Sequence, residues 1–247
     1  MSLQNLSDQL LHELGRQIVH GVLQPGQSLP KVEDLSAMKG VSRTVVREVL
    51  KSLAARRLIE STTKIGTRVC PRSNWQWWDR DVLTWASEVE DNHAFLTNLT
   101  EVRLALEPAA MELAARNATE QDIQHIQECF ERLQASLDDE EEWVKADYDF
   151  HLSLIQASNN ELIISLLQTL RLALERSRHT TFHAIRQSPA EPFPGPNEEI
   201  LDRHRAVMQA ICDKDGALAR QKMYELLTRV SQLITTNQQG KTKKSKY

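Results

Sequence analysis

The stretch LPKVEDLSAMKGVSRTVVREVLKSLAARRLIE, residues 29–60, decides the fold of the first part of the chain. Gly40 ends a short helical segment, and Ser42 is a favourable N-cap for a second segment with apolar residues at helical spacing. A longer helix precedes them, and its apolar stripe consists of Leu10, Leu14, Ile18 and Val22. Residues 58–72 predict two short strands around a turn at Lys64–Gly66. Three helices followed by a β-hairpin is the order of elements in a winged helix-turn-helix.

The basic residues of this region indicate binding to DNA. Arg43 and Arg47 lie one turn apart at the start of the third helix, outside its apolar stripe, and Thr44 lies beside them. Two guanidinium groups at one helix end suit phosphate and guanine contacts in a major groove. The alternative for these residues is an ordinary solvated helix face. Further contacts to the DNA backbone or minor groove are expected from a hairpin tip that contains Lys64, Gly66 and Thr67.

The net charge of −4 is distributed unevenly. Residues 1–73 hold 11 Lys and Arg against 6 Asp and Glu, a balance of +5, whereas the remainder holds 19 against 28, a balance of −9. A basic front part suits a polyanionic partner such as double-stranded DNA. The acidic remainder is expected to have a different task.

The composition indicates where the protein is located and argues against a membrane protein or a disulfide-rich scaffold. No run of about 18 uncharged apolar residues occurs, so we expect no membrane span. Cys70, Cys129 and Cys212 are far apart and odd in number, which argues against a disulfide scaffold or a thiolate metal site. The N-terminus has acidic residues and amphipathic spacing, unlike a signal peptide. We therefore expect a cytoplasmic protein.

Four of the five tryptophans lie in PRSNWQWWDRDVLTWASE, residues 71–88. An extended piece followed by a short helix at about 79–88 is predicted here. Tryptophans at this spacing usually pack against other residues. We expect them to join the first domain to the next one, or one subunit to another, and stacking on a ligand is the alternative.

From residue 93 onward the pattern is helical, and it predicts helices at 93–117, 119–137, 140–158, 160–186, 196–213 and 215–237. No strand pattern competes, so the fold class is mainly α, with an antiparallel all-α bundle behind the winged helix-turn-helix. The expected organisation is a DNA-binding domain, a tryptophan-rich linker with a short helix, an effector-binding and dimerisation domain and a disordered basic tail, at residues 1–73, 74–92, 93–238 and 239–247.

Ionisable residues fall on the inner faces of three of these helices. Asp147 and His151 are one turn apart, His204 lies within the apolar stripe of a later helix, and Arg103 precedes Glu107 by one turn. Each alone has an ordinary explanation, such as a local ion pair or a hydrogen-bonded core histidine. Together, one carboxylate and two imidazoles suit Zn²⁺ or a similar divalent ion with open positions. Arg103 could hold the carboxylate of a ligand through a fork contact.

The segments LP, VSRTVVREVL and GTRV resemble the DNA-binding domain of GntR-family transcription regulators. The resemblance implies that Arg43, Thr44 and Arg47 contact an operator and that residues 64–67 form the wing tip. The family usually has an arginine where this chain has Glu33, so one basic contact is absent.

The later segments EVRLALEPAAMELAARNAT, DYDFHLSLIQASNN and RHRAVMQAI are similar to the FCD-type effector domain of the FadR subfamily, and the tryptophan string is similar to the linker of its sugar-acid regulators. In metal-binding members, an Asp, a His one turn later and two further His hold a divalent metal. Asp147, His151 and His204 match three of these positions, whereas the fourth is Leu226. The expected effector contacts are Arg103, Glu107 and Asn160.

These observations predict a homodimeric transcription regulator, a repressor released from a palindromic operator by a small organic acid such as galactonate or gluconate. Three alternatives stay open: a metal-sensing regulator, a responder to fatty acyl-CoA, and a metal-dependent enzyme with an accessory DNA-binding domain. Because no residue beyond the metal ligands resembles a dedicated nucleophile or general base, we expect a protein that is not an enzyme.

Overall fold

The computed structural model describes residues 3–62, 66–89, 93–187 and 198–244. The chain forms two compact units, Met1–Asp91 and Asn92–Tyr247. Each unit has its own core and is described separately.

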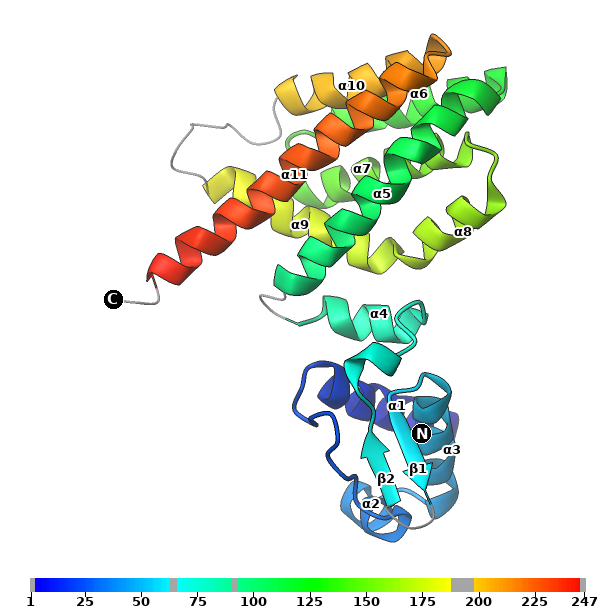
Figure 1. Cartoon of the computed structure of the whole chain (residues 1–247), viewed down its shortest axis with the longest axis vertical. Helices are drawn as coiled ribbons and strands as arrows, with labels where there is room; N and C mark the ends of the chain where they lie inside the picture. The colour runs from blue at the N-terminus through cyan, green and yellow to red at the C-terminus, as the bar shows by residue number, and fades with distance from the viewer. Residues whose placement is uncertain (1–2, 63–65, 90–92, 188–197, 245–247) are drawn as a thin grey trace. The chain divides into compact units, whose positions relative to one another are not determined.

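The first unit is a winged helix-turn-helix, which confirms the predicted fold (Figure 1). Helices α1 and α2 pack against α3, and the two strands pair antiparallel, with Ile59 opposite Val69. Residues 26–29 join the other edge of the second strand, where Leu29 N–H donates to the Thr67 carbonyl at 2.9 Å. The elements in order are α1 (Leu3–Val19), α2 (Val32–Lys39), α3 (Arg43–Ala55), β1 (Ile59–Thr62) and β2 (Gly66–Val69).

The turn between α2 and α3 follows from two residues. Gly40 has a φ of 64°, in the left-handed region that glycine adopts without steric cost, and so it ends α2. Ser42 caps α3, since its Oγ accepts a hydrogen bond from Val45 N–H at 3.3 Å. The buried face of α3 then consists of Val45, Val46, Val49 and Leu53.

The tryptophan-rich segment belongs to the first unit, so this compact unit extends well past residue 73. It contains a 3₁₀ turn, η1 (Arg72–Asn74), and helix α4 (Arg80–Ser87), which packs against α1. Trp75 Nε1 donates to the Cys70 carbonyl at 3.0 Å, and Trp85 Nε1 donates to His12 Nδ1 at 3.0 Å. These two tryptophans are therefore core residues of the first unit. Trp78 is half exposed.

Gly15 on α1 makes room for the indole of Trp85. A Cβ atom at position 15 would lie 2.4 Å from two ring atoms of Trp85. We expect Gly15→Ala to lower the free energy of unfolding of this unit by about 1–2 kcal/mol, because overpacking outweighs the gain of about 1 kcal/mol that alanine brings to a helix. Thermal unfolding measures the change, with Gln9→Ala on the exposed side of the same helix as control. A higher melting temperature for Gly15→Ala would contradict the close packing.

The second unit is an all-α bundle, as predicted (Figure 1). Helices α5 and α11 lie side by side, α7 packs against α5, α6 and α9, and α10 packs against α5, α6 and α11. Among the described residues, no helix has the length and apolar character needed to cross a membrane. The elements are α5 (His93–Asn117), α6 (Glu120–Ala135), α7 (Glu140–Gln156), α8 (Glu161–Thr169), α9 (Arg171–Gln187), α10 (Glu198–Cys212) and α11 (Gly216–Lys244).

Two features differ from the predicted helices. The single helix expected at 160–186 is two helices, α8 and α9, separated at Leu170. Leu170 N–H bonds the Leu167 carbonyl at 3.2 Å in a tight turn that keeps both leucines buried without any Gly or Pro. Helix α11 also continues to Lys244, into the segment expected to be a disordered tail, whose last residues, 245–247, lie outside the described part.

Candidate functional site

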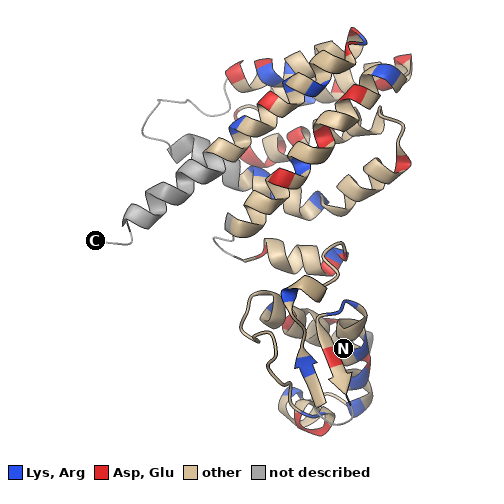
Figure 2. Ribbon diagram, viewed as in Figure 1, with Lys and Arg blue, Asp and Glu red and all other residues tan. Residues whose placement is uncertain are grey.

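The candidate DNA-binding face lies at the start of α3. Arg43, Thr44 and Arg47 are all exposed there, opposite the buried valine stripe. In Figure 2, the ribbons of α3 and β2 carry segments coloured for Lys and Arg. On the hairpin, Gly66 is exposed with a φ of 86°, and the Thr67 and Ser61 hydroxyls lie 2.8 Å apart across the strands. Lys64 lies outside the described residues.

The second candidate site is a buried polar cluster in the helical unit. Asp147 and His151 come from α7, and His204 comes from α10; all three are buried. Their ligand atoms lie within 4.8 Å of one another. The structure therefore brings together the three residues that the sequence predicts as metal ligands.

Hydrogen bonds fix which nitrogen of each imidazole carries the proton. His204 Nδ1 lies 2.7 Å from the Ile200 carbonyl, which only accepts, so Nδ1 is the donor. His151 Nδ1 lies 3.0 Å from Glu107 Oε2 and donates to that carboxylate. Both Nε2 atoms are thereby directed to one oxygen, Asp147 Oδ1, at 3.0 Å from His204 and 3.9 Å from His151.

The donor set fits a divalent ion. A metal-ligating histidine usually donates its other N–H to a carboxylate or a backbone carbonyl, and His151 and His204 each have such an acceptor. Burial lowers the pKa of His151 despite the neighbouring Asp147 and Glu107, which favours the neutral, metal-binding imidazole. Leu226 on α11 is buried and offers no donor atom, so Asp147, His151 and His204 are the three residues that could hold such an ion.

Glu107 links the cluster to Arg103 on the same helix. Its Oε1 accepts from Arg103 Nε at 2.6 Å, while its Oε2 accepts from His151. Burial opposes ionisation of Glu107, but Arg103 and His151 outweigh it and hold the pKa of this carboxyl far below its usual value. The structure thus gives Glu107 the role of orienting a histidine and compensating a buried arginine.

Arg178 on α9 is a residue of this cluster that the sequence did not indicate. Its Nε donates to Asp147 Oδ2, and its guanidinium lies 5.6 Å from the centre of the Tyr148 ring. Burial opposes ionisation of Asp147, but Arg178 and the two histidines outweigh it and keep the pKa of Asp147 well below its usual value. A signal existed in the sequence, since Arg178 continues the buried spacing of Leu170 and Leu174.

Asn160 is not part of the polar cluster, unlike Arg103 and Glu107. Its Oδ1 accepts from Leu162 N–H and Ile163 N–H, both at 3.2 Å, and so it caps α8. Within the described residues, no polar contact links it to Asp147 or to the histidines.

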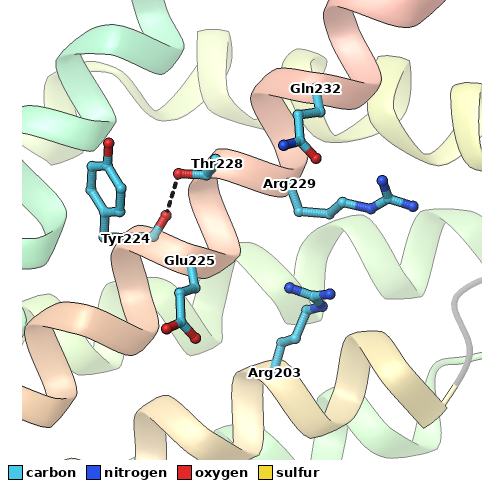
Figure 3. Close-up of a pocket in the computed structure, with 6 residues that line it drawn as sticks. All are labelled: Arg203, Tyr224, Glu225, Thr228, Arg229 and Gln232. Carbon is cyan, nitrogen blue, oxygen red and sulfur yellow. Dashed lines mark hydrogen bonds between the residues drawn. The ribbon is translucent and has the colours of Figure 1, made fainter.

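A separate hollow lies on the surface between α10 and α11 (Figure 3). Its volume is about 380 Å³, and Thr228 Oγ1 donates to the Tyr224 carbonyl along its wall. Arg203 contributes to this hollow, whereas its neighbour His204 is buried in the polar cluster. The hollow is therefore distinct from the predicted effector site. Its lining consists of Arg203, Tyr224, Glu225, Thr228, Arg229 and Gln232.

Comparisons with known proteins agree with both units. The profile described as bacterial regulatory proteins of the gntR family matches residues 6–69, and the profile of the FCD domain matches residues 98–229. The chain belongs to the GntR family. It is a DNA-binding transcriptional regulator with an FCD effector domain.

Relatives extend the match over most of the chain. The galactonate operon transcriptional repressor of Escherichia coli K12 is 33% identical over 217 residues, covering 88% of this chain and 91% of that protein. LutR, a transcriptional regulator of Bacillus subtilis, is 31% identical, covering 88% of this chain and 96% of its own. These relatives are regulators, which confirms that the protein is not an enzyme.

Solved structures support the fold alone. Lar of Listeria monocytogenes matches with a TM-score of 0.59 at 16% identity, covering 96% of this chain and 97% of that one. Escherichia coli McbR/YncC matches with a TM-score of 0.51 at 23% identity, covering 96% of this chain and 99% of that one.

Proposed function

We propose that this regulator is a homodimeric repressor that a small organic acid releases from its operator. The acid binds the FCD domain at a divalent metal, zinc or a similar ion, that Asp147, His151 and His204 hold. Arg43, Thr44 and Arg47 contact the operator, and the hairpin tip with Lys64, Gly66 and Thr67 adds contacts beside them. The similarity to the galactonate operon repressor makes a sugar acid the first ligand class to test.

One observation supports both the bound metal and the acid ligand. The Nε2 atoms of His151 and His204 are directed to the same carboxylate oxygen, and each ring has an acceptor for its Nδ1 proton. Lone pairs aimed at a carboxylate repel it unless a cation or a proton lies between them. A bound divalent ion supplies that cation, and its open positions take oxygen atoms of the ligand.

The charge of the buried cluster explains why the ligand is an anion. Arg103 and Glu107 compensate each other, as do Asp147 and Arg178, so these four groups sum to zero. A divalent ion adds two positive charges to a site that water barely reaches. A carboxylate ligand lowers this excess charge, so acid and metal strengthen each other's binding by the same factor.

Release requires that the acid binds one arrangement of the dimer better than the other. A ligand with equal affinity for the DNA-binding and non-binding arrangements would shift neither population. The acid therefore favours the arrangement in which the two winged helices no longer match the spacing of the two half-sites. A symmetric dimer also implies an operator with two-fold symmetry.

A gel shift on the DNA upstream of the protein's own gene tests the proposal. We expect galactonate or gluconate to release the protein, and a chelator to abolish the release without abolishing DNA binding. Release by Zn²⁺ alone, with no acid, would identify a metal sensor. Retention on DNA with every acid of the panel would contradict the proposed ligand class.

Asp147→Asn separates the effector site from the DNA-binding site. The amide keeps the shape of the side chain but loses the charge that attracts the metal, so zinc affinity should fall about 100-fold or more. Operator binding without acid should stay within about threefold, and release by acid should be lost. Equal loss of operator binding and release would mean that Asp147 is structural. A competition titration with a chelating dye measures the zinc affinity.

A further inference from the structure

The cluster contains a buried hydrogen-bond donor that no contact within the described residues satisfies. Arg178 is 7% exposed, and its Nη1 atom is buried without a hydrogen-bond partner. Buried guanidinium donors without partners are rare, because each one costs the free energy of its lost hydration. Such a donor next to a candidate ligand site points to a ligand atom as its missing partner.

The Nε and Nη1 atoms of the Arg178 guanidinium differ in their hydrogen bonding. Nε donates to Asp147 Oδ2, so one edge of the group is engaged with the carboxylate that the proposed metal also uses. Nη1 projects from another part of the planar group and is free to meet a second acceptor. The Tyr148 ring, 5.6 Å from the Arg178 Cζ atom, helps to hold the plane in one orientation.

Arg103 differs from Arg178 in this respect. Its Nε lies 2.6 Å from Glu107 Oε1, and its Nη2 lies 3.5 Å from Oε2, so one edge faces a carboxylate within its own helix. Arg178 is thus the arginine of the cluster that combines deep burial with an unsatisfied donor. Asp147, which accepts from this Nε, is itself shared with His204.

We propose that Arg178 is an anchor for the carboxylate of the effector, in addition to Arg103. Its Nη1 donates a charge-assisted hydrogen bond to a ligand oxygen while its Nε holds Asp147 in place. Binding of the anion to Arg178 is therefore coupled to the position of Asp147, one of the metal ligands on α7. This inference rests on the proposed function, since it names a residue that recognises the proposed acid.

Arg178→Lys tests the proposal while keeping a positive charge beside Asp147. An ammonium on a flexible chain can pair with Asp147, but it does not reproduce the planar fork that reaches two acceptors at fixed angles. We expect the full-length variant to bind galactonate or gluconate, whichever the unsubstituted protein binds, about 10- to 100-fold more weakly by calorimetry. Zinc affinity and operator affinity without acid should each stay within about threefold.

Arg171→Lys is the matched control. Arg171 also lies on α9 and against the Tyr148 ring, at 5.3 Å, but it is exposed and pairs with Glu175 at 2.8 Å. This variant should bind the acid like the unsubstituted protein. Unchanged acid affinity in Arg178→Lys would overturn the proposal and leave Arg178 as the counter-ion of Asp147.

Failure of the proposed function and failure of the Arg178 anchor give different experimental results. If the unsubstituted protein binds neither acid, with zinc present, the proposed ligand class fails and the Arg178 proposal falls with it. If it binds the acid and Arg178→Lys loses zinc and acid affinity in equal measure, the residue acts only by holding Asp147, and the anchor role is contradicted. Selective loss of acid affinity supports the direct contact.

Discussion

Replacement of Glu107 by alanine is expected to lower the free energy of unfolding of the FCD domain by about 3–5 kcal/mol, because it leaves a buried guanidinium without its counter-ion. Arg103 is 3% exposed and Glu107 is 1% exposed, so water does not take the place of the lost carboxylate. The same substitution removes the acceptor of His151 Nδ1. Two buried donors thus lose their partner in one change.

Differential scanning calorimetry of the full chain measures this loss. Glu199→Ala is the control, since Glu199 pairs with Arg203 at 2.8 Å on the exposed side of α10. An exposed pair of this kind contributes about 0–1 kcal/mol. Similar destabilisation by both substitutions would contradict the view that burial makes the Arg103–Glu107 pair important.

Glu107→Gln divides the effect into charge and orientation. The amide oxygen still accepts a hydrogen bond, so the stability loss should be smaller than for alanine. Zinc affinity should nevertheless fall by about 10- to 100-fold, since the carboxylate that orients His151 is gone. Unchanged zinc affinity in a folded Glu107→Gln protein would argue against a metal role for His151.

Local signals made the first unit predictable. Ser42 as N-cap and Gly40 as a left-handed residue have one dominant structural role each, and the valine stripe of α3 leaves one face for burial. The extent of the unit was less predictable, because the tryptophans indicate packing without indicating a partner. That Trp85 packs on Gly15 depends on two helices whose contact the spacing does not encode.

The polar cluster was predictable to the extent that helical spacing is regular. Asp147 and His151 share a face because they are one turn apart on an uninterrupted helix. Arg178 follows Leu170 and Leu174 at helical spacing, but that spacing alone did not distinguish it from the other arginines of this segment. Arg171 and Arg176 nearby made an arginine in this segment look like part of a solvated surface.

Loss of the two arginines at the start of α3 is expected to have the largest effect on DNA binding. Arg43 and Arg47 are exposed, lie one turn apart and form no ion pair within the part of the chain that the structure describes. Each good contact of an arginine with a guanine contributes about 1–3 kcal/mol. In the proposed dimer a single substitution removes two contacts, so Arg47→Ala should weaken operator binding by about 2–6 kcal/mol, or roughly 30-fold or more.

Fluorescence anisotropy with labelled operator DNA measures the affinity, and Lys51→Ala is the control. Lys51 is also an exposed basic residue of α3, but it lies two turns after Arg43 and pairs with Glu48 at 2.8 Å. A loss of the same size in both variants would mean that α3 binds DNA only through its total charge. Zinc and acid binding should be unchanged in both variants, since Arg47 and Lys51 belong to the first unit and the polar cluster belongs to the second.

The dependence on salt then distinguishes the two kinds of arginine contact. If Arg47 contacts a base, Arg47→Ala should weaken binding to the operator far more than binding to unrelated DNA. If Arg43 contacts a phosphate, Arg43→Ala should weaken both equally and lower the slope of log affinity against log salt by about one per lost contact. Because Ser42 fixes the start of α3, Arg43 lies at its first position and Arg47 one turn later. We therefore expect Arg43 to contact the DNA backbone and Arg47 the base edges. Equal loss on both DNAs for both variants would contradict this assignment, and it would move sequence recognition to Thr44 or to the wing.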